Sequence, residues 1–314
     1  RIKADPPPDR YARGWHTVGR AEDFRDGRPH VLEAFGTKLV AYQGADGELH
    51  VLDGYCPHMG AALGMGEIDG DCVVCPFHGW KWGADGRCKE IPYAKRIPPK
   101  ARIKTWPTME RNGLLFVWHD HEGHDPLPEH HIPVIEAVDS EEWSGWHITE
   151  WTIHTNCREL VDNQADMAHF GPVHGAPIDY FCNVFEGYKV TQIMHGGSNR
   201  LAEGGELRTC ATYYGPAYHI TEMYGQMGAY PVESILLNSH TPIDQNSFVL
   251  RFGIMVKWLP ELSDAENREL VEEYARNTRD GFYDDVEIWD HKTRVDRPVL
   301  CDGDGPIAGL RRWY

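Results

Sequence analysis

The hydrophobic and polar positions in the first part of the chain follow the patterns of short β-strands. Residues 113–118, GLLFVW, form about the longest apolar run and are expected to be a buried strand. Residues 71–74, Asp-Cys-Val-Val, predict a second, short buried strand. Trp80 and Trp82 lie two positions apart, as residues on one face of a strand do. The GADG sequence at 83–86 then predicts a hairpin turn.

A few segments in the second half of the chain have helical spacing instead. Apolar residues recur between positions 158 and 170 and predict a helix there: Leu160, Val161, Ala165, Met167, Ala168 and Phe170. Gly171-Pro172 is expected to end this helix. A further amphipathic helix is predicted to open at Ser263, which forms a capping box with Glu266, and residues 280–291 again have helical composition.

Length and charge fit a globular protein of two domains. The 314 residues carry a formal net charge of −17, which argues against nucleic acid because phosphate binding needs concentrated Lys and Arg. No apolar run approaches the ~18 to 20 residues that cross a bilayer, so no membrane span is expected. The histidine- and proline-rich stretch 119–133 is interpreted as a solvated connection without a metal, between domains at 1–125 and 126–314.

The eight cysteines are too sparse for a disulfide scaffold and fit a reducing, cytoplasmic setting. Six of them lack metal-ligand spacing with a histidine and are expected to be free thiols: Cys72, Cys88, Cys157, Cys182, Cys210 and Cys301. The other two belong to the pairs Cys56-Pro57-His58 and Cys75-Pro76-Phe77-His78.

These two pairs have the composition of a Rieske [2Fe–2S] centre, in which two thiolates hold one iron and two imidazoles hold the other. Glycines beside each pair permit the tight turns that bring sulfide close to the backbone. The alternative is a zinc site that begins with the Cys72-x2-Cys75 knuckle. Cys72 falls in the predicted strand, however, and is expected to be a strand residue rather than a ligand.

A second candidate site surrounds the predicted helix end. His169 and His174 flank Gly171-Pro172 and can point at a common ion. Two imidazoles and one carboxylate form the facial triad of oxygen-activating Fe(II) enzymes, so the site needs a carboxylate from elsewhere. The plainer alternative is a pair of satisfied core histidines.

Asp285 is the expected third ligand. In a helix it shares one face with Phe282 and Trp289, and a carboxylate between aromatic rings is costly unless it is paired or bound to metal. Asp284 and Asp290 fall on other faces. Phe282 and Trp289, together with Val173, are the candidates for the substrate pocket.

Two further acidic residues lie on the predicted stripe that carries His169. Asp166 is one helical turn before this histidine and is expected to accept its ring N–H, rather than to bind the metal itself. Asp162 lies one turn earlier, and its role stays open.

Longer strings extend these motifs over nearly the whole chain, from RYARGWH at 10–16, through VLDGYC and QNSFVLRFG, to GLRRWY at 309–314. In them the chain resembles the Rieske non-heme iron oxygenases, and in particular the oxygenase components of 3-ketosteroid 9α-hydroxylases. The resemblance implies an α+β protein with an N-terminal all-β Rieske domain and a C-terminal helix-grip domain, built on an antiparallel sheet.

The resemblance also implies the ligands and the assembly. It implies that Cys56, His58, Cys75 and His78 are the ligands of the [2Fe–2S] cluster. It likewise implies that His169, His174 and Asp285 are the ligands of a mononuclear Fe(II). It implies a homotrimer in which Asp166 bridges between His169 and the cluster ligand His78 of a neighbouring subunit.

The expected function is that of a terminal monooxygenase, which activates O2 and hydroxylates a small hydrophobic, steroid-like substrate at the 9α position of a 3-ketosteroid. No G-x-G-x-x-G fingerprint follows a predicted strand, so electrons are expected from a separate NADH-dependent flavin and iron–sulfur reductase. One alternative is another polycyclic or terpenoid substrate, including sterol desaturation. An alternative of a different class is a Rieske electron carrier without catalytic iron.

Overall fold

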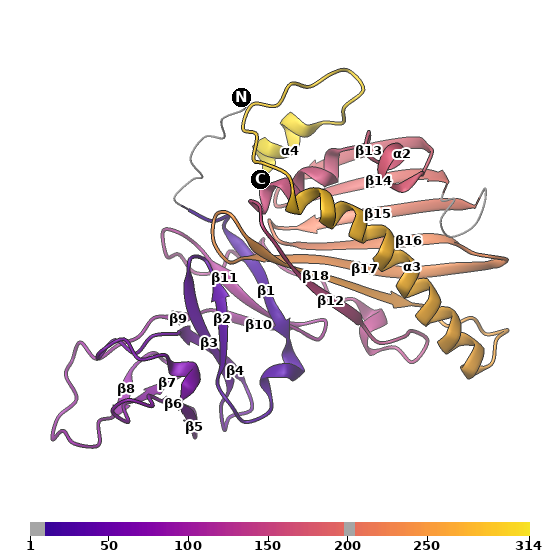
Figure 1. Cartoon of the computed structure of the whole chain (residues 1–314). Helices are drawn as coiled ribbons and strands as arrows, with labels where there is room; N and C mark the ends of the chain where they lie inside the picture. The colour runs from indigo at the N-terminus through magenta and orange to yellow at the C-terminus, as the bar shows by residue number, and fades with distance from the viewer. Residues whose placement is uncertain (1–9, 198–204) are drawn as a thin grey trace. The chain divides into compact units, whose positions relative to one another are not determined.

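The computed structural model describes residues 10–197 and 205–314, which form two compact units (Figure 1). The described part of the first unit is 10–128 together with 241–244, and the second unit contains the remaining described residues. Residues 241–244 join the first unit because the backbone N–H groups of Phe35 and Gly36 donate to the carbonyl oxygens of Pro242 and Ile243, over 2.8 and 2.7 Å.

The first unit consists of three antiparallel sheets, with strand orders β1-β11-β10, β2-β3-β4-β9 and β5-β6-β7-β8. Its strands are β1 Gly14–Arg20, β2 His30–Ala34, β3 Thr37–Gln43, β4 Leu49–Asp53, β5 Glu67–Asp69, β6 Cys72–Val74, β7 Lys81–Gly83, β8 Cys88–Glu90, β9 Thr105–Trp106, β10 Thr108–Arg111 and β11 Leu114–His119. Two 3-10 helices, η1 Ala21–Phe24 and η2 Leu63–Met65, connect them. The strands predicted around 71–74, 80–82 and 113–118 are confirmed as β6, β7 and β11.

Strand β3 separates two hydrophobic cores. Leu39 and Ala41 point into one core, and Val40 and Tyr42 point into the other, because successive side chains of a strand face opposite sides. The second core also contains three residues that bear on the candidate cluster site: Cys56, Cys75 and Trp82. The loops that carry the two cysteines are therefore anchored in a close-packed interior.

The second unit is built on a seven-stranded antiparallel sheet with the order β12-β18-β17-β16-β15-β14-β13, and α3 crosses one face of it (Figure 1). The strands are β12 His147–Ile153, β13 Ile178–Glu186, β14 Lys189–Gly197, β15 Glu206–Tyr214, β16 Tyr218–Met227, β17 Tyr230–Pro242 and β18 Phe248–Val256. The helices are η3 Glu136–Asp139, α1 Arg158–Val161, η4 Asp162–Ala165, α2 Phe170–His174, α3 Asp264–Asp290 and α4 Ile307–Trp313.

Helix α3 covers the sheet through an apolar stripe. Val271 and Tyr274 are almost completely buried, and they belong to one core cluster with Val232 of β17 and Phe252 of β18. This arrangement of one long helix on an antiparallel sheet confirms the predicted α+β class and the helix-grip domain. Among the described residues, no helix is both long and apolar enough to cross a membrane.

The predicted helix over 158–170 is wrong as a single element. The chain leaves helical geometry at Asp166, which has φ −88° and ψ 94°. The Asp166 carboxylate accepts the backbone N–H of Ala168 over 3.1 Å, a local bond that competes with the helix. Gly171-Pro172 does not end a helix but lies in the first turn of α2, where the missing N–H of proline costs no hydrogen bond.

The predicted helix start at Ser263 is confirmed, because both hydrogen bonds of the Ser263–Glu266 capping box are present. The helical stretch at 280–291 is the continuation of this same helix rather than a separate element. Helix α3 runs for 27 residues, which at about 1.5 Å per residue spans about 40 Å.

The histidine-rich stretch 119–133 is not solvated throughout. His119 is the last residue of β11 and is buried, and burial lowers its pKa to about 3. Asp120, Glu122 and His124 place ligand-type atoms within 4.8 Å of one another. Arg13, however, pairs with both carboxylates, over 2.6 Å to Asp120 and 2.8 Å to Glu122, so the cluster already has a cation.

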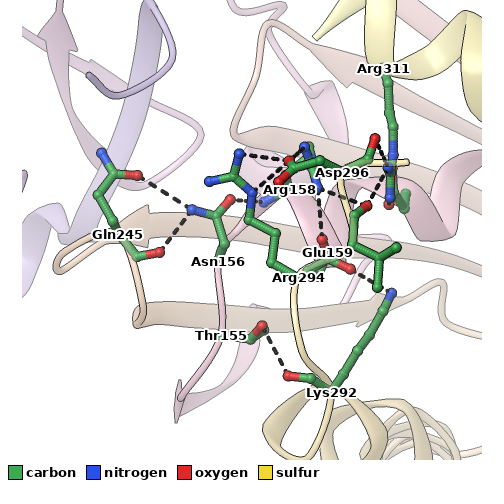
Figure 2. Close-up of polar contacts among 11 residues, drawn as sticks. Thr155, Asn156, Arg158, Glu159, Gln245, Lys292, Arg294, Asp296 and Arg311 are labelled. Carbon is green, nitrogen blue, oxygen red and sulfur yellow. Dashed lines mark hydrogen bonds and ion pairs between the residues drawn. The ribbon is translucent and has the colours of Figure 1, made fainter. Parts of the chain in front are cut away.

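A polar network joins the C-terminal segment to the start of α1 (Figure 2). Arg158 and Arg294 both donate to Asp296, over 2.8 and 2.7 Å, and Lys292 pairs with the buried carboxylate of Glu159 over 3.0 Å. Burial alone would raise the pKa of Asp296, but the hydrogen bonds from the two arginines lower it. The network holds α1 against a segment more than 130 residues away in sequence.

Asp162, whose role the sequence left open, is an anchor of the same region. Arg311 of α4 donates to both of its carboxylate oxygens, including an Nε–Oδ1 bond of 3.0 Å, and also to the carbonyl oxygen of Val295 over 2.6 Å. The Asp162 and Arg311 side chains are 9% and 16% exposed, so this is a largely buried ion pair.

We expect Arg311→Met to destabilise the second unit by about 3 kcal/mol, because it leaves the Asp162 carboxylate buried without its cation. The measurement is chemical denaturation followed by tryptophan fluorescence. Adding Asp162→Asn to Arg311→Met should recover part of the loss.

The neighbouring Arg312 is exposed and provides the matched control. Arg312→Met should change the free energy of unfolding by less than about 0.5 kcal/mol. Equal effects of the two arginine substitutions would contradict the buried-pair interpretation.

Candidate metal centres and substrate cavity

Two loops of the first unit have the same turn, and each holds one buried thiol. Cys56 follows β4 and Cys75 follows β6, and they are 1% and 2% exposed. In each loop the backbone N–H of the glycine four residues later donates to the cysteine carbonyl oxygen, over 2.8 Å from Gly60 and 3.0 Å from Gly79. Both glycines have positive φ, 77° and 71°, a conformation that other residues adopt with strain.

The two predicted histidines complete this group. The ring centroids of His58 and His78 lie 4.6 Å apart. Nδ1 of each ring is buried and has no hydrogen-bond partner in the described part of the chain, which is costly unless a ligand satisfies it. Two buried thiols and two unpartnered imidazole nitrogens are the donor set of a Rieske cluster, and the residues therefore fit this group.

Two tryptophans also contact the cluster residues, a role that the sequence pattern did not signal. The Trp80 ring stacks on His58, with centroids 4.5 Å apart, and its N–H donates to the hydroxyl of Tyr93 over 2.8 Å. The N–H of Trp82 donates to Sγ of Cys56 over 3.3 Å. Hydrogen bonds to the sulfurs help to set the reduction potential of such a cluster.

The second candidate centre lies in the second unit, where His169, His174 and Asp285 converge. Their ligand-type atoms all lie within 4.8 Å of one another. Nε2 of His174 is 3.1 Å from one carboxylate oxygen of Asp285, and Nε2 of His169 is 4.0 Å from the other. Asp285 is 5% exposed, so its charge needs a cationic or metal partner in place.

The break in the chain at Asp166 orients His169. Nδ1 of His169 donates to the backbone carbonyl oxygen of Asp166 over 2.7 Å, which leaves Nε2 to face Asp285. The direct acceptor is thus this carbonyl, and not the carboxylate that the sequence suggested, which lies 3.7 Å away. Burial alone would lower the pKa of His169, but the carboxylates of Asp166 and Asp285 raise it above its usual value.

The Asp166 carboxylate itself is 40% exposed. Burial would raise its pKa, but interactions with His169 lower it, and the side chain stays ionised. It therefore presents a negative charge at the surface next to His169.

The histidines and Asp285 open into a cavity of about 190 Å³, between the sheet and α3. This is far more than the ~10 to 15 Å³ that one water needs. The surface of the cavity is mainly apolar, and Phe170, Met194, Leu207, Met223, Leu236 and Phe282 contribute to it. Besides the three converging residues, nine polar side chains also line the cavity: Asn163, Gln164, Gln192, Thr209, His219, Thr221, Asn238, Asn277 and Thr278.

Of the three predicted pocket residues, one lines the cavity and two do not. Phe282 lines the cavity. Trp289 instead packs in a core cluster with Ile153, Leu160 and Phe248. Val173 is half-buried on α2 and is not among the described residues that line the cavity.

Of the three carboxylates compared in the sequence, Asp285 is the one that lines the cavity. Asp284 falls on another face of α3. The Asp290 carboxylate is engaged by His154, whose backbone N–H and ring Nδ1 each lie 2.8 Å from it.

Comparisons with known proteins agree with this geometry. Residues 14–107 match the Rieske [2Fe-2S] domain family, and residues 117–314 match the family described as the 3-Ketosteroid 9alpha-hydroxylase C-terminal domain. The chain is 46% identical to a 3-ketosteroid-9-alpha-monooxygenase, oxygenase component, of Rhodococcus rhodochrous, with 100% of this chain and 83% of the relative covered. It is 47% identical to the protein of the same name from Mycobacterium tuberculosis, over 100% and 83%.

Among solved structures, the chain is similar to dicamba monooxygenase bound to dicamba, with a TM-score of 0.72 and 19% identity over 98% of this chain and 96% of that one. At this identity the likeness shows the fold alone. The sequence matches confirm the resemblance noted in the sequence, and they imply a [2Fe–2S] cluster, a mononuclear iron and O2 as co-substrate. The chain belongs to the Rieske non-heme iron monooxygenases, in the family of the 3-ketosteroid-9-alpha-monooxygenase oxygenase components.

Proposed function

We propose that this chain is a terminal oxygenase component that hydroxylates the 9α position of a 3-ketosteroid-like substrate, with electrons from a separate NADH-dependent flavin and iron–sulfur reductase. The observation that carries the proposal is that His169, His174 and Asp285 converge on the wall of a mainly apolar cavity. A facial triad leaves coordination positions open for O2, and the cavity holds an apolar body beside them. The names of the relatives support the steroid class.

In this proposal His169, His174 and Asp285 hold the iron, and Cys56, His58, Cys75 and His78 hold the cluster. The bound metals supply O2 activation and electron storage, which side chains alone do not provide. The protein contributes position and environment. The Asp166 carbonyl fixes the His169 ring, and the apolar side chains of the cavity, among them Met223, Leu236 and Phe282, exclude water from around the substrate.

Asp166 has a second role in this proposal. Its half-exposed carboxylate would accept a hydrogen bond from His78 of a neighbouring subunit in a homotrimer, and so connect the two metal centres between subunits. The motif resemblance supports this assignment, and the outward-facing, ionised carboxylate beside His169 is compatible with it.

Product analysis tests the proposed function. The purified chain, reconstituted with a reductase and NADH, should convert a 3-ketosteroid to a product one oxygen heavier, with O2 uptake coupled to product. Asp285→Ala should abolish the product and remove the iron beyond the two of the cluster, because the triad loses its carboxylate.

Asp284→Ala is the matched control, since it removes the neighbouring carboxylate on another face of α3. It should retain iron and activity. Loss of iron in Asp284→Ala with retention in Asp285→Ala would move the ligand by one residue. A wild-type chain that holds only the cluster irons would favour the electron-carrier alternative.

Asp166→Asn tests the bridge. The variant should keep both metals and still accept electrons from the reductase into the cluster. Substrate oxidation should fall by about 100-fold, because the amide has no negative charge to hold a histidine N–H on the partner side. Turnover near the wild-type rate, or an active monomer in sedimentation, would refute the bridge and the trimer.

Trp82→Phe tests the contact with Cys56. Loss of the N–H donor should destabilise the reduced, more negative cluster about tenfold relative to the oxidised one, which lowers the reduction potential by about 59 mV. Protein-film voltammetry measures the shift.

Trp106→Phe is the control for this substitution. The Trp106 N–H donates to Asp53 over 2.9 Å and not to a cluster ligand, so the potential should stay unchanged. An equal shift in both variants would mean that the potential reports general packing and not the sulfur contact.

A further inference from the structure

A chain of buried hydrogen bonds inside the cavity begins at Gln164. Its side-chain Nε2 donates to the carbonyl oxygens of Ala211 and Val190, over 2.7 and 3.2 Å. Both amide hydrogens are thereby used, and the orientation of the amide is determined. Oε1 of Gln164 therefore points the other way and needs a donor.

That donor is the ring of His219. Its Nε2 lies 2.9 Å from Oε1 of Gln164, so Nε2 carries the hydrogen. Burial lowers the pKa of His219 to about 3, and the ring is neutral. A neutral ring with hydrogen on Nε2 has an acceptor at Nδ1.

Asn238 of β17 is the direct partner of His219 of β16 in the pairing of the two strands. The two strands are neighbours in the sheet (Figure 1). The side-chain amide nitrogen of Asn238 lies 3.3 Å from Nδ1 of His219 and must be the donor, because Nδ1 has no hydrogen to give. The amide of Asn238 thus has one orientation. Asn238 lines the cavity, and its Oδ1 is buried without a hydrogen-bond partner among the described residues.

We infer that Oδ1 of Asn238 is a specificity-determining acceptor, which selects substrates that carry a hydroxyl group over those that carry a carbonyl at the same position. This inference rests on the proposed function and deepens it, because it names a second functional group of the steroid-like substrate. A hydroxyl donates a hydrogen bond to Oδ1. A carbonyl oxygen would face it as a second acceptor and leave both oxygens unpaired in a buried site.

The opposite end of the cavity has no such preference for a hydroxyl group over a carbonyl group. Oγ1 of Thr209 is also buried without a partner in the described structure, and a hydroxyl can either donate or accept. It can therefore donate to the carbonyl of a 3-ketosteroid.

The strand register separates the two ends. Thr209 pairs with Met223, which pairs with Ser234, four residues before Asn238 on β17. Four residues of strand span about 13 Å. Between them, the cavity wall contains Leu236, so the cavity fits an elongated apolar body with one polar group at each end.

The first experiment needs no variant. Two 3-ketosteroids that differ only at the D ring, one with a hydroxyl and one with a carbonyl there, are compared with the metal-loaded enzyme. We expect kcat/KM to be about tenfold higher for the hydroxyl steroid, and isothermal titration should show the same preference in the dissociation constants. Equal values for the two steroids would overturn the inference, since a retained water would then satisfy Oδ1 in both complexes.

Variants then identify the atom. Asn238→Leu removes the acceptor and should bring the ratio of the two kcat/KM values to about one. His219→Phe removes the ring that orients the amide, so the amide can turn its N–H toward a carbonyl, and the ratio should fall as well. The control Thr209→Val should affect both steroids alike and leave the ratio at the wild-type value.

The outcomes separate this inference from the proposed function. A preference that persists in Asn238→Leu, or that disappears in Thr209→Val alone, would overturn the role of Asn238 while the steroid oxygenase activity stands. Should Asn238→Leu not fold, an unchanged ratio in His219→Phe would overturn it instead. Binding of neither steroid would refute the proposed function and, with it, this inference.

Discussion

The charge on Asp285, buried in a mainly apolar cavity, is the constraint on which the catalytic unit depends. An isolated carboxylate in such a place is strongly unfavourable, and two histidines from a separate segment lie within reach of it. The requirement that these three side chains meet determines where α2 lies against α3. It also explains why the chain between α1 and α2 cannot continue as one helix, since the turn at Asp166 is what aims His169 at the carboxylate.

The first unit has to present two thiols and two imidazoles close together, and it does so by using one type of turn twice. Two loops, one after β4 and one after β6, use the same glycine-closed turn to present one thiol and one imidazole each, and both thiols are embedded in a hydrophobic core. The donor Trp82 lies in the short strand β7 that follows the second loop, and the stacked Trp80 immediately precedes this strand. Rigid surroundings of this kind limit the rearrangement of the ligands when an electron arrives or leaves.

Local patterns predicted the parts of the structure that depend on local contacts. The cysteine and histidine pairs, the strand that contains Cys72 and the capping box at Ser263 are short-range features, and the structure has each of them in place. The helical periodicity also placed Asp285 on the buried face of α3. The break at Asp166 was missed because helical composition outweighed a single side-chain bond to the backbone.

The remaining features depend on residues distant in sequence, which periodicity does not relate. The burial of His119 follows from the packing around β11, and the location of Trp289 follows from the contacts of α1 and β18 with α3. The Asp162–Arg311 pair joins positions 149 residues apart, and the orientation of Asn238 depends on Gln164, another element altogether. No pattern within a window of ten or twenty residues contains this information.

The continuity of α3 has a consequence for how such an enzyme can change. One uninterrupted helix carries the proposed metal ligand Asp285, the cavity residue Phe282 and the core residue Tyr274. A substitution that tilts or shifts this helix moves the proposed iron site and the cavity wall together, so it cannot reshape the cavity without disturbing the chemistry. The strands β14 to β17 are not coupled in this way, because each side chain on their inner face can be exchanged over a fixed backbone. New substrate preferences in this architecture should therefore arise through substitutions of the cavity-lining residues on β14 to β17, while α3 stays unchanged.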